Sequence, residues 1–152
     1  MNDRYLYRAK RVDNGEWVEG YFLNVAKTNA FICTGKIKLD GALKGIIAPE
    51  MYAVDRSTIC QCTGLMDKNG MLIWENDIIK YHFGNVYAPI KYGEYKSCFD
   101  STPTGHIGFY VDWTGTTKEN MRKDIGYWIN MVEADVAGNI FDNPELLEVD
   151  HE

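Results

Sequence analysis

An Asn-Gly pair between two apolar runs is the feature that most constrains the fold of this chain. In TGLMDKNGMLIW, residues 63–74, Asn69-Gly70 can form a two-residue primed turn or a type I turn closed by glycine at a β-bulge. The sequence DNG at residues 13–15 stands in the same way between RYLYRAKRV and EWVEGYFL. We therefore predict a β-hairpin at each of these two places.

The other apolar segments are short, and glycine and proline interrupt them. Alternating or extended patterns predict strands at residues 31–34, 59–63, 106–113 and 126–132, with short strands and loops at 35–54. IIKYHF, residues 78–83, alternates and predicts a half-buried strand, whereas residues 84–105 predict a long loop or a weak hairpin. Many short strands with few helices favour a mainly antiparallel β fold, built as a small barrel or as coiled sheets.

Two short helical segments are also expected. Residues 116–119, TTKE, have the form of a capping box, which predicts one helical turn. Near the C-terminus, Asn143 can cap a helix, Pro144 suits its first position, and Glu145 suits the positive end of its dipole. We therefore predict a short helix over residues 143–150.

Length and composition indicate one folded domain over residues 1–152. The chain is 45% hydrophobic and 25% charged, far from the composition of disordered proteins. No apolar run approaches the roughly 18 residues of a membrane-spanning helix, and the N-terminus lacks the apolar region of a signal peptide. We expect a cytoplasmic protein without a membrane partner.

Charge is distributed unevenly along the chain. Residues 1–48 hold 8 Lys and Arg against 5 Asp and Glu, whereas residues 49–152 hold 8 against 17. The acidic C-terminal part would repel a phosphate backbone, whose binding depends on Lys and Arg. Nucleic acid is therefore a disfavoured partner, although the basic N-terminal half leaves local contacts open.

Four cysteines, Cys33, Cys60, Cys62 and Cys98, are expected to be reduced thiols, because the cytosol keeps thiols free. Cys60 and Cys62 point to the same face of a strand and, with Cys33, Cys98 or His82, could form a tetrahedral zinc site. Their spacing is not one of the usual zinc-binding spacings, so we interpret them as small buried hydrophobes. We expect no metal and no other cofactor.

Glu75, Asp77 and His82 could be drawn as an acid, a base and an orienting partner. Carboxylates between two strands are more often turn formers, and we favour a solvated turn. The sequence contains no nucleophile elbow, P-loop, dinucleotide fingerprint or zinc-protease motif. We expect no catalytic residues, and the protein is interpreted as a non-enzyme.

The four tryptophans, Trp17, Trp74, Trp113 and Trp128, lie in or beside predicted strands. Core packing is the favoured interpretation, because each indole buries a large area. Tryptophan is also enriched at protein interfaces, so Trp74, Trp113 and Trp128, together with Asp77, are the candidate binding residues of an interaction surface.

Two groups of segments resemble a known family. STICQCTGL, DKNG and IWENDII, at residues 57–65, 67–70 and 73–79, precede AGNIFDNPELL at 137–147. They are similar to motifs of the YopX family of phage and prophage proteins, which typically carry TGLxDKNG, I-[YW]-E-G-D-I-[IV] and GNI-[YF]-x-NPELL. The order of these motifs and the distance between them match the family pattern. The opening segment RYLYRAKRVDNGEWVEGYF is also similar to the opening strands of the family. The chain departs at Asn76, where the family usually has Gly; Asn tolerates the left-handed region, so we expect the turn to persist.

The resemblance implies an all-β fold of coiled antiparallel sheets that includes an SH3-like barrel, and it implies oligomerisation. We assign N-terminal hairpins and strands to residues 1–58, the SH3-like barrel portion to 59–142, and the C-terminal helix to 143–150. The resemblance supplies no catalytic residues.

We therefore expect a non-enzymatic phage or prophage protein in the host cytoplasm that forms homo-oligomers and contacts a host or phage protein. A nucleic-acid accessory protein is the alternative, and an enzyme that uses Glu75, Asp77 and His82 is the least favoured one.

Overall fold

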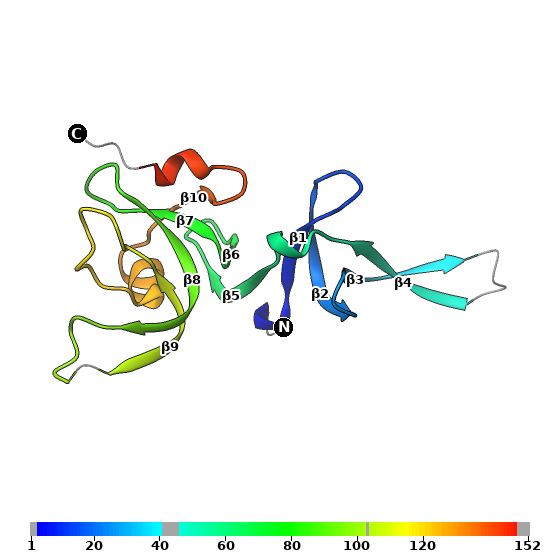
Figure 1. The fold of residues 1–152 in the computed structure, drawn as a ribbon, viewed down its shortest axis with the longest axis horizontal. Coiled ribbons are helices and arrows are strands. Elements are labelled where there is room, and N and C mark those ends of the chain that lie inside the picture. Colours follow the sequence, from blue (N-terminus) through cyan, green and yellow to red (C-terminus); the bar gives the residue numbers. More distant parts are fainter. Residues whose placement is uncertain (1–2, 41–45, 103, 149–152) are drawn as a thin grey trace. The chain divides into compact units, whose positions relative to one another are not determined.

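The computed structural model describes residues 3–40, 46–102 and 104–148, and for residues 37–40 and 46–48 the backbone alone. Within these residues fourteen elements follow in chain order, ten strands and four short helices (Figure 1): η1 Asp3–Tyr5, β1 Tyr7–Lys10, β2 Trp17–Val25, β3 Asn29–Asp40, β4 Ile46–Ala53, η3 Arg56–Thr58, β5 Cys60–Met66, β6 Leu72–Trp74, β7 Asp77–Lys80, β8 Tyr87–Lys96, β9 Gly105–Val111, η4 Tyr127–Met131, β10 Val136–Asn139 and η5 Pro144–Leu147. The mainly antiparallel β class predicted from the sequence is confirmed.

The chain divides into two compact units, Met1–Cys62 and Thr63–Glu152. β5 belongs to both, since its first residues pair with β1 and its last residues lead into the hairpin with β6. We describe each unit by itself.

The N-terminal unit is an antiparallel sheet in the order β4-β3-β2-β1, with β5 beside β1. The hairpin predicted at residues 13–15 forms between β1 and β2, and Gly15 takes a φ of 73° in its turn. β2 and β3 form the next hairpin, and β3 continues to Asp40, well beyond the predicted strand at residues 31–34. Part of the predicted stretch between β3 and β4 lies outside the described residues.

One face of this sheet carries the core of the N-terminal unit. Its buried members come from β1 to β3 and from the residue after β4: Ala9, Val18, Ala30, Ile32 and Val54. The short helix η3 closes this core at one side. Thr58 is buried there, and its Oγ1 accepts a hydrogen bond from the Lys10 backbone N–H at 2.8 Å and donates one to the Asp55 carbonyl oxygen at 2.7 Å.

The C-terminal unit contains a four-stranded antiparallel sheet in the order β10-β7-β8-β9. β8 and β9 pair from Ile90 and Val111 to Lys96 and Gly105, so residues 84–105 contain a strand and a long hairpin, the second of the two predicted alternatives. Figure 1 shows β8 as a strongly curved strand. The described strands are assigned to open sheets, and the SH3-like barrel stays an expectation from the resemblance.

The half-buried strand predicted at residues 78–83 is wrong in its extent and its burial. β7 ends at Lys80, and Ile78 and Ile79 are both fully buried. The reason is that both faces of β7 are covered: Ile79 belongs to the core cluster of Trp113 and Trp128, and Ile78, which points to the opposite face, is 0% exposed as well. Phe83, beyond the strand, is 73% exposed.

The extended segment predicted at residues 126–132 is also wrong, because Tyr127–Met131 form the helix η4. The Asp124 carboxylate accepts hydrogen bonds from the N–H groups of Gly126 and Tyr127, at 2.9 and 3.4 Å, and so satisfies donors at the start of the helix. Trp128 and Ile129 anchor the helix in the core. A run as apolar as YWINMV does not distinguish strand from helix by periodicity.

The helical turn predicted from the capping box at residues 116–119 does not form. Thr116 Oγ1 accepts from the Lys118 N–H at 3.0 Å and donates to the Trp113 carbonyl oxygen at 2.7 Å, which gives a non-helical turn. The C-terminal helix does form, as the 3₁₀ helix η5 over Pro144–Leu147. It is shorter than predicted, residues 149–150 lie outside the described part, and the Asn143 side chain makes no capping hydrogen bond.

Gly20 allows β2 to change partners. β2 pairs with β1 as far as Gly20 and with β3 from Tyr21 onward. A Cβ atom at Gly20 would overlap the carbonyl oxygen of Cys33. The backbones of β2 and β3 can approach this closely only because residue 20 has no side chain.

We predict that Gly20→Ala lowers the free energy of unfolding by about 1–3 kcal/mol, the usual range for overpacking against rigid backbone. Urea unfolding followed by tryptophan fluorescence measures it. Gly108→Ala is the matched control, since a Cβ there has nothing within 4 Å and the variant should stay close to wild type. Equal loss in both variants would contradict the role given to Gly20.

Candidate functional site

The segment 60–74 forms the predicted hairpin, β5–β6. The Asp67 carboxylate accepts hydrogen bonds from the N–H groups of Asn69 and Met71, at 2.8 and 3.0 Å, and the Gly70 N–H donates to the Asp67 carbonyl oxygen at 3.0 Å. Gly70 has a φ of 79°, and Asn69 is not among the described residues with positive φ. This is the type I turn closed by glycine, one of the two predicted alternatives.

Asn76 and Asp77 build the bend between β6 and β7. Asn76 has a φ of 67°, so the prediction that it would take the left-handed conformation is confirmed. Asp77 is only 3% exposed, and its Oδ2 accepts a hydrogen bond from the Trp74 N–H at 2.9 Å. This carboxylate holds the backbone of the bend in place.

The two groups of family motifs meet at this bend: the first motif spans residues 57–79, and the second motif spans residues 137–147. The Ile140 N–H donates to the Asn76 carbonyl oxygen at 3.0 Å, and β10 pairs with β7 so that Asn139 lies opposite Asp77. The Asn139 side chain accepts from the N–H groups of Phe141 and Asp142, both at 3.0 Å, and folds the chain toward η5. The two motifs therefore form one structural junction.

Gly138 makes room within that junction. A Cβ atom there would overlap Oδ1 of Asn143, which accepts a hydrogen bond from the Asn139 N–H at 3.3 Å. Gly138, the first residue of GNIFDN, thus leaves the space that the side chain of Asn143, its last residue, occupies. Asn143 acts through this bond within the motif and not as the predicted helix cap.

The candidate binding residues Trp74, Asp77, Trp113 and Trp128 are all buried, with exposed fractions of 3% or less. The predicted core packing is confirmed for these three tryptophans, whereas Trp17 is half-buried and its ring lies under Arg8 and Lys10. None of the four candidates is placed on an open surface in this structure. Their assignment as binding residues stays a prediction.

Trp113 and Trp128 form the centre of the C-terminal core. Their ring centroids are 5.0 Å apart, and Tyr81 lies edge-on to both, at 6.0 and 5.8 Å. Both indole N–H groups donate to one acceptor, the Arg122 carbonyl oxygen, at 3.2 and 2.6 Å. The N–H group of each indole is therefore hydrogen-bonded, and each ring is packed in the core.

The charged turn next to Trp113 is held by Asp112. Its carboxylate contacts Lys91 Nζ at 2.6 Å and accepts from the Thr114 N–H at 3.2 Å. Burial raises the pKa of Asp112, but the hydrogen bonds from Lys91 and Thr114 outweigh burial and lower it.

Glu75, Asp77 and His82 do not converge on a cavity. Asp77 is committed to the bend, Glu75 is half-buried, and His82 is exposed beyond the end of β7. The His82 ring packs against the Phe83 ring, with 4.1 Å between centroids and an angle of 54° between the planes. This scatter over a bend and a loop does not support an acid–base site.

The four cysteines are free thiols, with Cys60 and Cys62 fully buried, Cys33 half-buried and Cys98 exposed. Within residues 3–40, 46–102 and 104–148, no group of three or more His, Cys, Asp and Glu side chains is placed to hold a metal ion. In the same part of the chain, no helix is long and apolar enough to cross a membrane.

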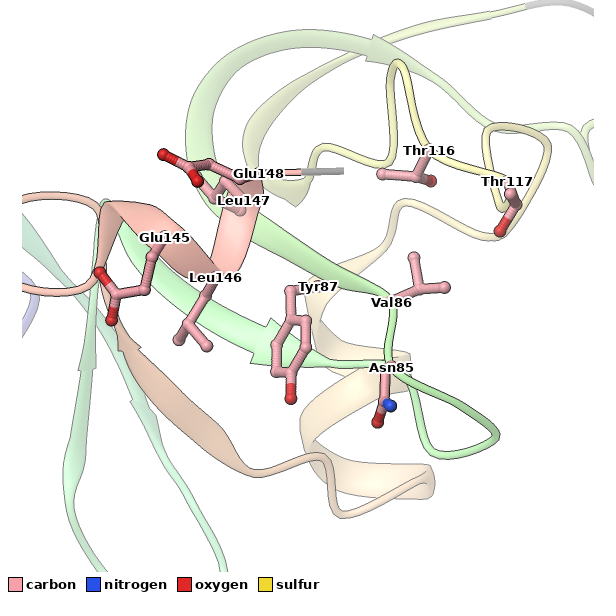
Figure 2. Close-up of a pocket in the computed structure, with 9 residues that line it drawn as sticks. All are labelled: Asn85, Val86, Tyr87, Thr116, Thr117, Glu145, Leu146, Leu147 and Glu148. Carbon is pink, nitrogen blue, oxygen red and sulfur yellow. The ribbon is translucent and has the colours of Figure 1, made fainter. Parts of the chain in front are cut away.

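A cleft of about 350 Å³ lies beside η5 in the C-terminal unit (Figure 2). One wall is η5, with Leu146 and Leu147, and the other is formed by Val86, by Tyr87 at the start of β8 and by the turn that follows Trp113. The NPELL part of the second motif forms the first wall. The cleft could not be predicted from the sequence, in which these residues indicate only a helix.

The outer face of β2, β3 and β4 is a second candidate surface, in the N-terminal unit. Tyr21 on β2 lies opposite Cys33 on β3, and Cys33 lies opposite Met51 on β4, so these three side chains form a row across the strands. Leu23, opposite Phe31, begins the next row. Tyr21, Leu23, Val25 and Met51 are 43%, 40%, 53% and 46% exposed. A signal for it exists in the sequence, because Tyr21, Phe22 and Leu23 are apolar at consecutive positions and so present apolar groups on both faces.

Two compact units of antiparallel strands, with two sequence motifs joined at one bend, define a mainly β protein whose described residues contain no cluster placed to hold a metal ion. The chain belongs to the YopX family, since the family model described as "YopX protein" matches residues 6–148. The resemblance inferred from the motifs is thereby confirmed. No curated protein and no solved structure matches the chain.

We predict that Asn76→Ala lowers the free energy of unfolding by about 1 kcal/mol, because alanine lacks the tolerance of asparagine for the left-handed region. Asn76→Gly, which restores the residue usual in the family, should leave stability unchanged or raise it. Urea unfolding of both variants compares them at one position. Equal stability of the Ala and Gly variants would show that the bend does not depend on this conformation.

Proposed function

We propose that this protein is a non-enzymatic interaction module that assembles with copies of itself. The observation that carries the proposal is the apolar face of the N-terminal sheet, defined here as Tyr21, Leu23, Val25, Phe31, Cys33 and Met51. Contiguous exposed apolar patches mark interaction sites in soluble proteins.

The apolar face is not needed for the core of its own unit. The alternate residues of the same strands, among them Phe22, Ile32 and Tyr52, belong to the core cluster on the other side of the sheet. Folding therefore leaves the outer face available to a partner. Burying it in an interface would contribute favourable free energy at roughly 25 cal/mol per Å² of apolar area.

A second copy of the chain is the partner that we favour. A two-fold symmetric interface uses the same patch on both copies, so charges at its edge have to complement one another. Arg8 and Glu19 lie opposite each other on β1 and β2, on the same face as Tyr21 and beside the apolar patch. A two-fold axis through the patch can bring Arg8 of each copy toward Glu19 of the other.

The resemblance adds context to this proposal. We place the assembly in the cytoplasm of a host cell that carries a phage or prophage, with residues 59–142 as the SH3-like portion. A host or phage protein is a further partner consistent with such a module.

The nucleic-acid alternative has less support. Three cations of the N-terminal unit contact their own neighbours: Arg11 pairs with Asp13 at 2.5 Å, Arg56 donates to Asn24 at 2.7 Å, and Lys10 Nζ lies 5.4 Å from the centre of the Trp17 ring. Binding of phosphates by these side chains would compete with those contacts. A gel shift with DNA and RNA at low salt tests the alternative, and a shift that weakens steeply with added salt would favour it over self-assembly.

We predict that the wild-type protein is oligomeric at about 100 µM and that Leu23→Lys raises its apparent dissociation constant at least about tenfold, as expected when a charge enters the centre of an apolar interface. Sedimentation velocity over a dilution series measures this. Ile107→Lys is the matched control, because Ile107 is 78% exposed but lies in the C-terminal unit.

A wild-type protein that is monomeric at every concentration would refute the proposal. An unchanged Leu23→Lys oligomer would show that another surface carries the assembly. Far-ultraviolet circular dichroism establishes that both variants are folded, which is expected because both side chains face away from the described core clusters.

A further inference from the structure

We infer that the open edge of β9, residues 105–109, binds an extended segment of a partner protein as an added antiparallel strand. The segment carries two apolar residues at alternate positions and Lys or Arg at the next alternate position. The inference does not depend on self-assembly, because β9 and the apolar face lie in different units. Its grounds are the direction of the backbone groups of β9, the side chains beside the edge and the place of one carboxylate.

β9 is the last strand of the sheet β10-β7-β8-β9, and the chain itself covers only one end of its outer edge. There the Val111 N–H donates to the Lys123 carbonyl oxygen at 2.8 Å, and Tyr110 forms an antiparallel bridge with Asp124. Among the described residues, 105–109 pair with β8 alone. The edge thus already holds a short antiparallel segment at one end and has room for another beside it.

The backbone groups of Ile107 and Phe109 point toward the open side of β9. In an antiparallel pair, residues alternate between directing both N–H and C=O to the partner strand and directing both away from it. The Val111 N–H points away from β8, whereas the Asp112 N–H donates to the Pro89 carbonyl oxygen of β8 at 2.9 Å. Ile107 and Phe109 alternate in step with Val111, so their donors and acceptors face outward. An extended peptide supplies acceptors and donors at the matching spacing.

The side chains beside this edge are apolar on one face. Phe109 and Ile107 share the face of Val111, which is fully buried in the core. Phe109 packs against that core, and Ile107 is 78% exposed. Tyr92, opposite Phe109, is 54% exposed, and the two ring centroids are 5.1 Å apart. Two apolar side chains of an added strand, opposite Phe109 and Ile107, would lose water against this surface.

The carboxylate of Glu94 lies on the same face, at the start of β9. A Cβ atom at Gly105 would lie 2.7 Å from Glu94 Oε1, so the carboxylate takes the space that residue 105 leaves. No ion pair within the described part of the chain includes Glu94. The residue of the added strand opposite Gly105 meets this carboxylate, which favours Lys or Arg there. Lys96, also opposite Gly105, should reduce the gain by like-charge repulsion.

A second copy of β9 suits this edge less well than such a segment. Antiparallel pairing centred on Ile107 would place Gly105 of one copy opposite Phe109 of the other. Phe109 would then lack an apolar partner, and a phenyl ring, not a cation, would lie beside Glu94. Charge and side-chain size therefore both favour a segment of a different protein.

The test is a titration of the ¹⁵N-labelled full chain with the peptide acetyl-Val-Thr-Val-Thr-Lys-amide, followed by amide chemical shifts. We expect saturable shifts centred on residues 105–109. In the antiparallel register the amides of the first, third and fifth peptide residues face β9, and those of the two threonines face away. N-methylation of the second valine should weaken binding at least about tenfold, whereas N-methylation of either threonine should change it less than about threefold.

Two variants of the protein locate the contacts. Ile107→Pro removes one outward N–H and leaves the hydrogen bonds to β8 intact, so it should weaken binding at least about fivefold; Ile107→Val is its matched control. Glu94→Gln should weaken binding of the lysine peptide about two- to fourfold, as expected of one exposed charge pair, and should leave binding of a norleucine-ended peptide unchanged. Glu119→Gln, a change at an exposed glutamate of the same unit, is the control for charge.

Three outcomes would overturn the inference. They are the absence of shifts at residues 105–109 up to about 5 mM peptide, equal binding of the peptides methylated at valine and at threonine, and shifts at this edge that follow protein concentration without peptide. The third would assign the edge to a second copy. Self-assembly through the apolar face is measured separately, by sedimentation of Leu23→Lys without peptide, so the two proposals can fail independently.

Discussion

The peptide groups on either side of Asn76 hold the C-terminal unit together. The Asn76 N–H donates to the Ile90 carbonyl oxygen of β8 at 2.8 Å, and the Asn76 carbonyl oxygen accepts from the Ile140 N–H at 3.0 Å. Both bonds depend on the left-handed conformation that turns the chain at this residue. One bend thus fixes the end of the β5–β6 hairpin against β8 and against the segment that follows β10, although these segments are far apart in sequence.

The spacing of the two motifs follows from that bend. The first motif supplies the hairpin and the bend, and the buried Asp77 carboxylate stabilises the bend by accepting the Trp74 N–H. The second motif supplies β10, which pairs with β7, and the turn around Asn139, which leads the chain to η5. Between them, β8, β9 and η4 contribute Ile90, Val111 and Ile129 to the core around Trp113 and Trp128. The motifs are therefore architectural, and their polar residues are used within the fold.

The parts that could be predicted from sequence are those that local chemistry determines. Gly70 and Asn76 take a positive φ, and a turn that needs such residues can be predicted from a few positions of the sequence. The helix η4 could not be predicted in the same way, because its start depends on Asp124 and its stability on a distant partner, Trp113. The burial of both Ile78 and Ile79 likewise depends on which segments cover the two faces of β7, and those contacts are a property of the whole unit. Local pattern identified the strand, and tertiary context decided its burial.

The candidate surfaces are harder still to predict, because a sequence does not state which side of a strand becomes the core. In β2, both Phe22 and its neighbours Tyr21 and Leu23 are apolar, so alternation gives no preference. The structure resolves it through β1 and β3: Ala9 and Ile32 lie on the side of Phe22, and that side closes into the core. Tyr21 and Leu23 are then left outside as a consequence of packing on the other side. The same logic applies to η5, whose leucines form a cleft wall only because β8 and the turn after Trp113 lie across from them. In both units, the surface available to partners is defined by what the core does not use, and this is why motifs that describe the fold so well carry no signal for binding.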